Sequence, residues 1–123
     1  MILLDTNAVL WLLSDHPRAA PIRDGRHRLA VSPVSLLELQ LLIEVGRLEL
    51  AVGVDLRATI ARHGWRLDSP TSQALFDAAV EVSWTRDPFD RLLAAHARLR
   101  RWRLATGDRM LIAGLPVEDV VAL

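Results

Sequence analysis

The chain opens with MILLDTNAVLWLL (residues 1–13), a short apolar run that ends at a carboxylate and is followed at once by polar residues. Residues 1–4 have the length and composition of a buried strand. Asp5, Thr6 and Asn7 are helix-capping residue types, and they predict a helix over residues 8–13. A strand followed directly by a helix is typical of a parallel sheet, because parallel strands need a crossover connection between them.

Short apolar runs and helical patterns alternate along the rest of the chain. Further strands are predicted at residues 28–31, 65–67, 102–106 and 117–121, and further helices at residues 33–45, 54–63, 72–82, 88–101 and near residue 110. Glycine or capping residues mark several of the helix ends, as Ser32 and Gly46 do for the helix over residues 33–45. This alternation predicts an α/β fold, a short parallel sheet flanked by helices on both faces, as a single domain over residues 1–123.

Composition excludes several classes of chemistry. The net charge of the chain is zero, and all 15 basic residues are arginine. The absence of lysine excludes lysine-dependent phosphate loops and Schiff-base enzymes. The absence of cysteine excludes disulfides and thiolate metal sites, in agreement with a cytoplasmic protein. Asp5 interrupts the early apolar run, so a signal peptide is not expected. A membrane-spanning helix is not expected either, since no uncharged apolar stretch reaches about 18 residues.

Five carboxylates lie at the edges of apolar runs, where a lone charge is costly to desolvate: Asp5, Glu38, Asp87, Asp90 and Asp108. Asp5 and Asp108 directly follow predicted strands, so we expect both at the carboxyl edge of the sheet, where ligands of such folds bind. A shared divalent cation would neutralise several of these acids together. Oxygen ligands favour Mg²⁺ or Mn²⁺, ions that assist the hydrolysis of phosphodiesters.

Helix capping alone could account for several of these acids. Asp5 and Asp108 could each cap the helix that follows, and Asp87 before a proline is a favourable N-cap that places Asp90 in the first turn. Glu38 lies on the same helical side as apolar residues such as Leu41, so we expect this side to be buried. Glu38 could then be a buried acid paired with an arginine or a backbone amide. We interpret Asp90 as a ligand and Asp87 mainly as a cap, because alanines line the helix side that carries Asp90.

Four short motifs contain these acids. They are Leu4-Asp5-Thr6-Asn7, Ser35-Leu36-Leu37-Glu38-Leu39, Asp87-Pro88-Phe89-Asp90-Arg91-Leu92-Leu93 and Thr106-Gly107-Asp108. Their identity, order and spacing resemble the PIN-domain ribonucleases, and among these the VapC toxins of type II toxin–antitoxin systems. The resemblance implies a catalytic quartet that holds Mg²⁺ or Mn²⁺, supported by neighbouring polar residues: Asp5, Glu38, Asp90 and Asp108, with Thr6, Asn7, Asp87 and Thr106. Gly107 departs from the motif, since similar chains often have alanine or another residue there.

The resemblance also implies an activity and partners. VapC-like toxins are metal-dependent endoribonucleases that cut RNA, often tRNA or rRNA, are inhibited by a cognate VapB-like antitoxin, and work as homodimers. Residues 11–13 together with Leu42, Ile43 and Val45 could form an apolar groove for the antitoxin, although ordinary core packing would also explain them.

Several arginines are candidates for contacts with RNA. Arg91 is adjacent to Asp90, and Arg98 and Arg101 belong to an arginine-rich run over residues 98–103. Such a run can bind phosphates, or it can be a solvated helix end whose cations favour the carboxyl terminus of the helix.

Two other functions are open on the sequence alone. A catalytically inactive PIN-like module could bind RNA or a protein, although a binding role does not need four converging acids. A phosphotransfer domain that forms an aspartyl phosphate would need a lysine and an Asp-x-Asp-x-Thr run, and the chain has neither.

Overall fold

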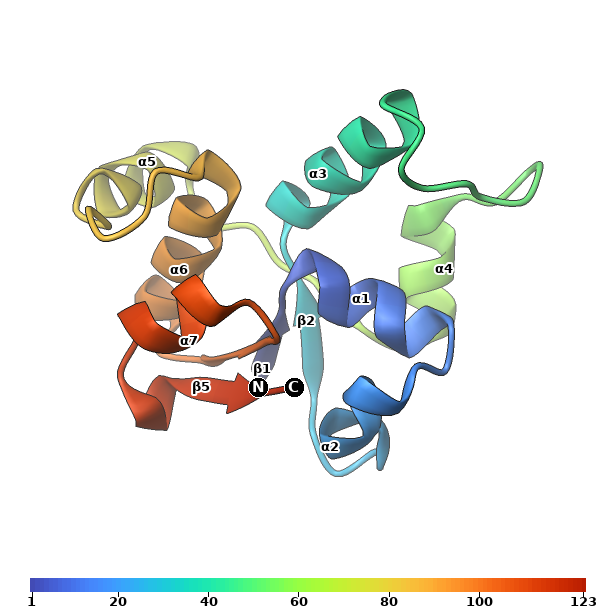
Figure 1. The fold of residues 1–123 in the computed structure, drawn as a ribbon, viewed down its shortest axis with the longest axis horizontal. Coiled ribbons are helices and arrows are strands. Elements are labelled where there is room, and N and C mark those ends of the chain that lie inside the picture. The colour runs from blue at the N-terminus through green and yellow to red at the C-terminus, as the bar shows by residue number, and fades with distance from the viewer.

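A five-stranded, fully parallel sheet organises the molecule (Figure 1). The structure is a computed structural model that describes residues 1–123. The strands are β1 (Ile2–Leu4), β2 (Leu29–Val31), β3 (Arg66–Leu67), β4 (Arg103–Thr106) and β5 (Val120–Ala122), in the spatial order β3-β2-β1-β4-β5. Leu3 pairs with Ala30 on one side and with Leu104 on the other, so β1 is the centre of the sheet. The predicted α/β fold is confirmed.

Helices cover both faces of this sheet. They are α1 (Thr6–Leu13), α2 (Ala20–Arg23), α3 (Pro33–Glu44), α4 (Leu56–Arg62), α5 (Ser72–Val80), α6 (Pro88–Arg100) and α7 (Arg109–Gly114), with short 3₁₀ turns η1 (Pro17–Ala19) and η2 (Val117–Asp119). In Figure 1, α5, α6 and α7 lie on one side of the sheet and α1, α2 and α4 on the other. None of these helices has the length and apolar character needed to cross a membrane.

Alternation along the short strands divides the core in two. Leu3, Ala30 and Leu104 belong to a buried cluster shared with α5, α6 and α7. Leu4 and Val31, one residue further along their strands, belong to a second cluster with α1, α2 and α4. Strands that are buried on both faces must be apolar throughout, which explains the continuous apolar runs in the sequence.

The structure differs from the predicted elements at three places. The helix α2 was not predicted, because a single turn anchored by one buried residue, Ile22, carries too little periodicity to recognise. The last strand begins at Val120 rather than at Val117, which is 87% exposed in a 3₁₀ turn after Pro116. On α3, Leu41 was expected on a buried side with Glu38, but it is exposed.

The carboxyl edge of the sheet is where helices begin. Asp5, directly after β1, is the N-cap of α1, and Ser32, directly after β2, is the N-cap of α3. Asp108 lies two residues after β4 and is the N-cap of α7. The strand ends therefore place several helix N-termini around one edge of the sheet.

Candidate functional site

A cavity of about 110 Å³ lies at this edge and is lined almost entirely by polar residues. The residues that line it are Asp5, Thr6, Asn7, Glu38, Asp87, Asp90, Leu93 and Asp108. All five acids singled out in the sequence are present, and they come from four separate segments of the chain. The fold therefore brings the predicted acids together, although their catalytic roles remain predictions.

Three of the acids cap helices as well as lining the cavity. Asp5 Oδ1 accepts a hydrogen bond from the Ala8 amide at 2.6 Å. Asp87 Oδ1 accepts from the Asp90 amide at 3.2 Å and from the Phe89 amide at 2.8 Å. Asp108 Oδ1 accepts from the amides of Met110 and Leu111 in α7, at 2.8 and 3.0 Å. Each cap uses Oδ1 alone, so capping and lining of the cavity are compatible for these acids.

Glu38 reaches the cavity from the middle of α3, and Asp90 reaches it from the first turn of α6. The Thr6 hydroxyl donates a hydrogen bond to Glu38 Oε1 and links the start of α1 to α3. Thr106, fully buried at the end of β4, accepts a hydrogen bond from the Asp108 amide at 3.0 Å. Thr6 and Thr106 therefore hold the acids in place by hydrogen bonds to them or to their backbone.

Crowding of carboxylates in a partly dry site raises their pKa values. The pKa of Asp90 is raised to about 7, chiefly by burial and then by the negative charges of the other four acids of the cavity. Burial also raises the pKa of Asp5 to about 6, with Glu38 and Asp108 contributing, although the Thr106 hydroxyl and the Ala8 amide oppose the shift. The site therefore carries negative charge that the protein itself does not neutralise.

Glu38 follows the same pattern. Burial is the largest cause that raises its pKa, and the charges of Asp87 and Asp108 add to it, while the hydrogen bond from Thr6 opposes it. Groups with pKa values raised together in one cleft are typical of functional sites.

The chemistry of the donor set fits a hard divalent cation, since the available ligands are carboxylate and hydroxyl oxygens and no arginine lines the cavity. As placed, however, no three acidic, histidine or cysteine side chains lie close enough together to hold an ion. The residues thus supply the right ligand type without a preformed coordination sphere.

The arginines proposed for RNA lie outside this cavity. Arg91 Nε donates to the Thr85 carbonyl oxygen at 2.8 Å, and its side chain lines a separate, largely apolar cavity between α5 and α6. Arg98 and Arg101 line a cavity of about 410 Å³ together with Trp102 and Asp119. These two arginines share one hollow at the end of α6, away from the acids.

The other arginines of the run over residues 98–103 have partners within the protein. Arg100 pairs with Asp68, with 2.8 Å between Nε and Oδ2, and Arg103 donates to the Val120 carbonyl oxygen at 2.9 Å. The run is therefore divided between structural and solvent-facing side chains.

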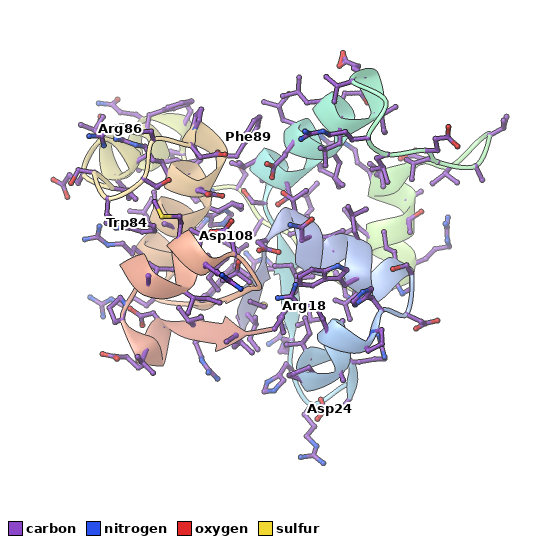
Figure 2. All side chains as sticks on the ribbon, viewed as in Figure 1. Arg18, Asp24, Trp84, Arg86, Phe89 and Asp108 are labelled. Carbon is purple, nitrogen blue, oxygen red and sulfur yellow. The ribbon has the colours of Figure 1, made fainter.

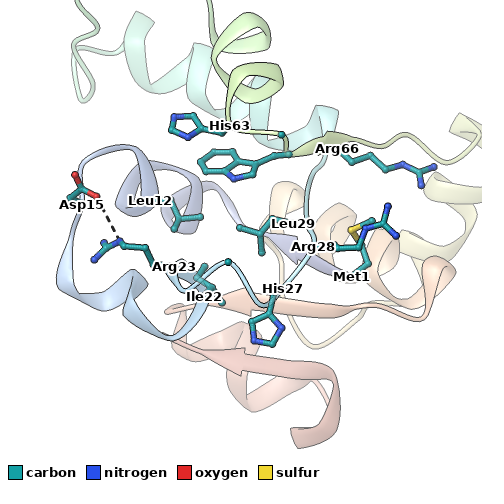
Figure 3. A pocket seen from close by; sticks show the side chains of 13 residues that line it. Met1, Leu12, Asp15, Ile22, Arg23, His27, Arg28, Leu29, His63 and Arg66 are labelled. Carbon is teal, nitrogen blue, oxygen red and sulfur yellow. Dashed lines mark ion pairs between the residues drawn. The ribbon is translucent and has the colours of Figure 1, made fainter.

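Of the six apolar residues expected to form one groove, only Leu12 and Ile43 line a cavity, and they line different ones. Leu12 lines a cavity of about 490 Å³ at the amino ends of β1, β2 and β3, where the Asp15–Arg23 ion pair and His63 also lie (Figure 3). Ile43 lines a different cavity of about 430 Å³ between α3 and α4. A single groove that joins these residues is not present.

Gly107 permits a close approach that the sequence did not predict. A Cβ atom at this position would lie 2.6 Å from Trp11 Cη2 and 2.5 Å from Arg18 Nη2. The Arg18 guanidinium lies over the Trp11 ring, 4.3 Å from its centroid, and Nη2 donates to the Leu123 carbonyl oxygen at 2.8 Å. The glycine therefore lets Trp11 and Arg18 pack against the segment that positions Asp108.

The comparisons with known proteins agree with this geometry. The family model of the PIN domain matches residues 2–113. The ribonuclease VapC22 of Mycobacterium tuberculosis is 33% identical over 115 residues, which cover 89% of this chain and 88% of that protein.

Solved structures show the same fold at lower identity. A toxin–antitoxin complex from Klebsiella pneumoniae matches with a TM-score of 0.72 at 21% identity, covering 99% of this chain and 97% of that one. The VapBC2 complex from Rickettsia felis, bound to a promoter DNA fragment, matches with a TM-score of 0.63 at 18% identity, covering 100% and 99%. By the family model and the VapC relative, the chain belongs to the PIN domain family, among its VapC-like toxins.

Proposed function

We propose that this protein is a divalent-metal-dependent endoribonuclease that acts as the toxin of a toxin–antitoxin pair. The observation that carries the proposal is the cavity at the carboxyl edge of the sheet, with five carboxylates and raised pKa values at Asp5, Glu38 and Asp90. The similarity to a ribonuclease VapC supports RNA as the substrate.

Each residue has a role that follows from its place. Asp5, Glu38, Asp90 and Asp108 would hold Mg²⁺ or Mn²⁺, which when bound polarises the scissile phosphate and activates a water molecule for attack. The protein's own contribution is orientation: Thr6 holds Glu38 and Thr106 holds the Asp108 backbone. Asn7 and Asp87, which are exposed at the mouth of the cavity, are placed to contact the substrate or solvent around it.

An antitoxin partner is supported by the structural neighbours, two of which are toxin–antitoxin or VapBC complexes. The acid cavity would also accept a guanidinium group in place of a metal ion. An arginine of a VapB-like antitoxin is therefore a chemically suitable inhibitor. Removal of the antitoxin is then expected to be required for RNA cleavage.

A homodimer is supported by unpartnered apolar side chains on two helices. On α3, Leu37, Leu41 and Val45 are 58, 40 and 65% exposed and recur every four residues, which places them on one helical side. On α5, Phe76 and Val80 are 59 and 73% exposed. A second copy of the chain would bury these side chains, which are costly to leave in water.

The proposal is tested by incubating the purified chain, free of antitoxin, with total RNA and Mg²⁺ or Mn²⁺. The Asp5→Asn and Asp90→Asn variants keep the side-chain shape and remove one charge each. Asp24→Asn is the matched control, because Asp24 is an exposed acid outside the cavity (Figure 2).

Discrete products from wild type and Asp24→Asn, lost in both site variants and in EDTA, are the expected result. Intact RNA with protein that is folded and binds Mn²⁺ would contradict the nuclease assignment and favour a binding module instead. Products that persist in EDTA would contradict metal dependence.

A further inference from the structure

A second cluster of polar side chains is buried beside the acid cavity. His96, on α6, is 0% exposed, and each ring nitrogen has one partner. Nδ1 lies 2.9 Å from Ser32 Oγ, and Nε2 lies 2.9 Å from Asp68 Oδ2. Ser32 and Asp68 are themselves 0% and 3% exposed. The cluster therefore crosses the interior between the end of β2, the end of β3 and the middle of α6.

A neutral imidazole satisfies the hydrogen bonds of this cluster. Ser32 Oγ already accepts a hydrogen bond from the Val34 amide at 3.2 Å, so its own hydrogen is free to be donated to Nδ1 of His96. Nε2–H then donates to the carboxylate of Asp68, which can only accept. Burial lowers the pKa of His96, against the opposing effect of Asp68, in agreement with a neutral ring.

Two arginines also pair with the Asp68 carboxylate. Arg100 Nε lies 2.8 Å from Asp68 Oδ2, and Arg66 Nη2 lies 3.1 Å from Asp68 Oδ1. Burial raises the pKa of Asp68, but the hydrogen bonds and charges of Arg100 and His96 outweigh it and lower the pKa below its ordinary value, with Arg100 contributing more than His96. Each polar side chain of the cluster therefore has a partner within the protein.

Although serine, histidine and aspartate form a hydrogen-bonded series here, a nucleophilic triad is excluded. Ser32 Oγ is fully buried and is occupied as the N-cap of α3. No cavity in the structure includes Ser32 or His96 among its lining residues. A substrate cannot reach this serine, so its role lies within the protein.

The cluster joins the two helices that carry Glu38 and Asp90. Glu38 lies six residues after Ser32, and Asp90 lies six residues before His96, so each acid is about 9 Å along its helix from the Ser32–His96 hydrogen bond. The helices α3 and α6 also pack against each other. A change of about 10° in their relative orientation would move either acid by about 1.5 Å, enough to cost about 100-fold in a reaction that needs aligned groups.

We infer that His96 is a positioning residue of the acid site: hydrogen-bonded to Ser32 and Asp68, it fixes α3 against α6 and so sets the separation of Glu38 and Asp90. The inference rests on the proposed metal-binding role of these acids. It predicts that loss of the two hydrogen bonds weakens metal binding even in protein that remains folded.

The test compares the affinity of the variants for Mn²⁺ rather than their ribonuclease activity. His96→Leu keeps much of the side-chain volume but has no hydrogen-bonding atom. His96→Gln can still accept from Ser32 and donate to Asp68, and it is the conservative variant. Val82→Ala is the matched control, because Val82 is 0% exposed in the core cluster packed on α6 but lies outside the hydrogen-bonded series.

Mn²⁺ affinity is measured by calorimetry on the full chain, free of antitoxin, at a temperature where circular dichroism shows every variant folded. His96→Leu is expected to lose about tenfold or more in affinity, as when residues that support metal ligands are replaced. His96→Gln is expected to recover most of that loss, and Val82→Ala to match wild type. Should His96→Leu not fold, Ser32→Ala removes the same interhelical hydrogen bond and is expected to weaken Mn²⁺ binding likewise.

The outcomes separate this inference from the proposed function. Equal Mn²⁺ affinity in wild type and His96→Leu would overturn the positioning role alone. Equal loss in His96→Leu and Val82→Ala would also overturn it, because general destabilisation would then explain both. Failure of folded wild type to bind Mn²⁺ would overturn the proposed metal site and, with it, this inference.

Discussion

Replacing Asp5 by asparagine should make the metal-free protein more stable while it abolishes cleavage. Asp5 is 4% exposed at the centre of the acid cavity, and its pKa is raised from the ordinary 3.8 to about 6, chiefly by burial. Asparagine keeps an oxygen at the position that accepts the Ala8 hydrogen bond at 2.6 Å. The substitution therefore removes the buried charge and leaves the helix cap in place.

The sign and size of the effect follow from the two pKa values. Because the folded state holds the proton of Asp5 more tightly than the unfolded state, the contribution of Asp5 to stability is complete below pH 3.8 and is lost as the pH rises to about 6. The difference of about 2 pH units, at about 1.4 kcal/mol each, gives a penalty of about 3 kcal/mol above pH 7. The variant avoids this penalty, so about 3 kcal/mol is the upper limit of its gain.

Urea unfolding in EDTA, at pH 8 and at pH 4, measures the free energy of unfolding of wild type and Asp5→Asn. The gain should approach its limit at pH 8 and nearly vanish at pH 4. In saturating Mg²⁺ the order should reverse at pH 8, because only wild type gains the full binding energy of the ion. A gain of equal size at both pH values, or a loss at pH 8, would refute the reasoning from buried charge.

Three further predictions concern other parts of the molecule. Gly107→Ala should lower the free energy of unfolding by about 1–3 kcal/mol through overlap with the Trp11 ring, seen as a lower Tm; Trp11→Leu in the same chain should restore part of the loss, and no recovery would argue against this clash. Leu41→Glu should convert a dimer to a monomer in sedimentation experiments without a change in circular dichroism, since Leu41 is exposed on α3. Arg98→Ala combined with Arg101→Ala should weaken RNA binding and flatten its salt dependence by about one ion per arginine, so an unchanged slope would exclude them as phosphate contacts.

The sheet and most helices could be predicted because burial on both faces leaves a strong local signal. The apolar runs before Asp5 and over residues 103–106 are strands, and the helix from Pro33 ends before Gly46, which has a positive φ of 76°. Elements without such a signal were missed, as α2 was. The exposed apolar stripe of α3 was also misjudged, because periodicity shows that Leu41 shares a helical side but not whether another chain covers it.

The acids of the site could be predicted more completely than the residues that support them. An acid beside an apolar run stands out from its neighbours, as Asp5 and Glu38 do. Asp68 directly follows the predicted strand over residues 65–67, a signal that it shares with Asp5, but the polar residues around it make it resemble a surface aspartate. Its burial depends on contacts with His96 and Arg100, which lie 28 and 32 residues away in the chain. Long-range pairing of this kind leaves no pattern in a single sequence.

Helix capping and the proposed metal binding, which the sequence presents as alternatives, are compatible in this structure, because the same acids can serve both. Asp5, Asp87 and Asp108 each accept backbone hydrogen bonds through Oδ1 at the start of α1, α6 and α7. The partial positive charge of a helix N-terminus favours a carboxylate there, so three helices reduce the cost of gathering acids before any cation binds. The offset is incomplete, since the pKa of Asp5 is still raised to about 6 despite its cap. The remaining negative charge of the carboxylates can be neutralised by a divalent ion, or by an arginine of a partner that binds at the same place.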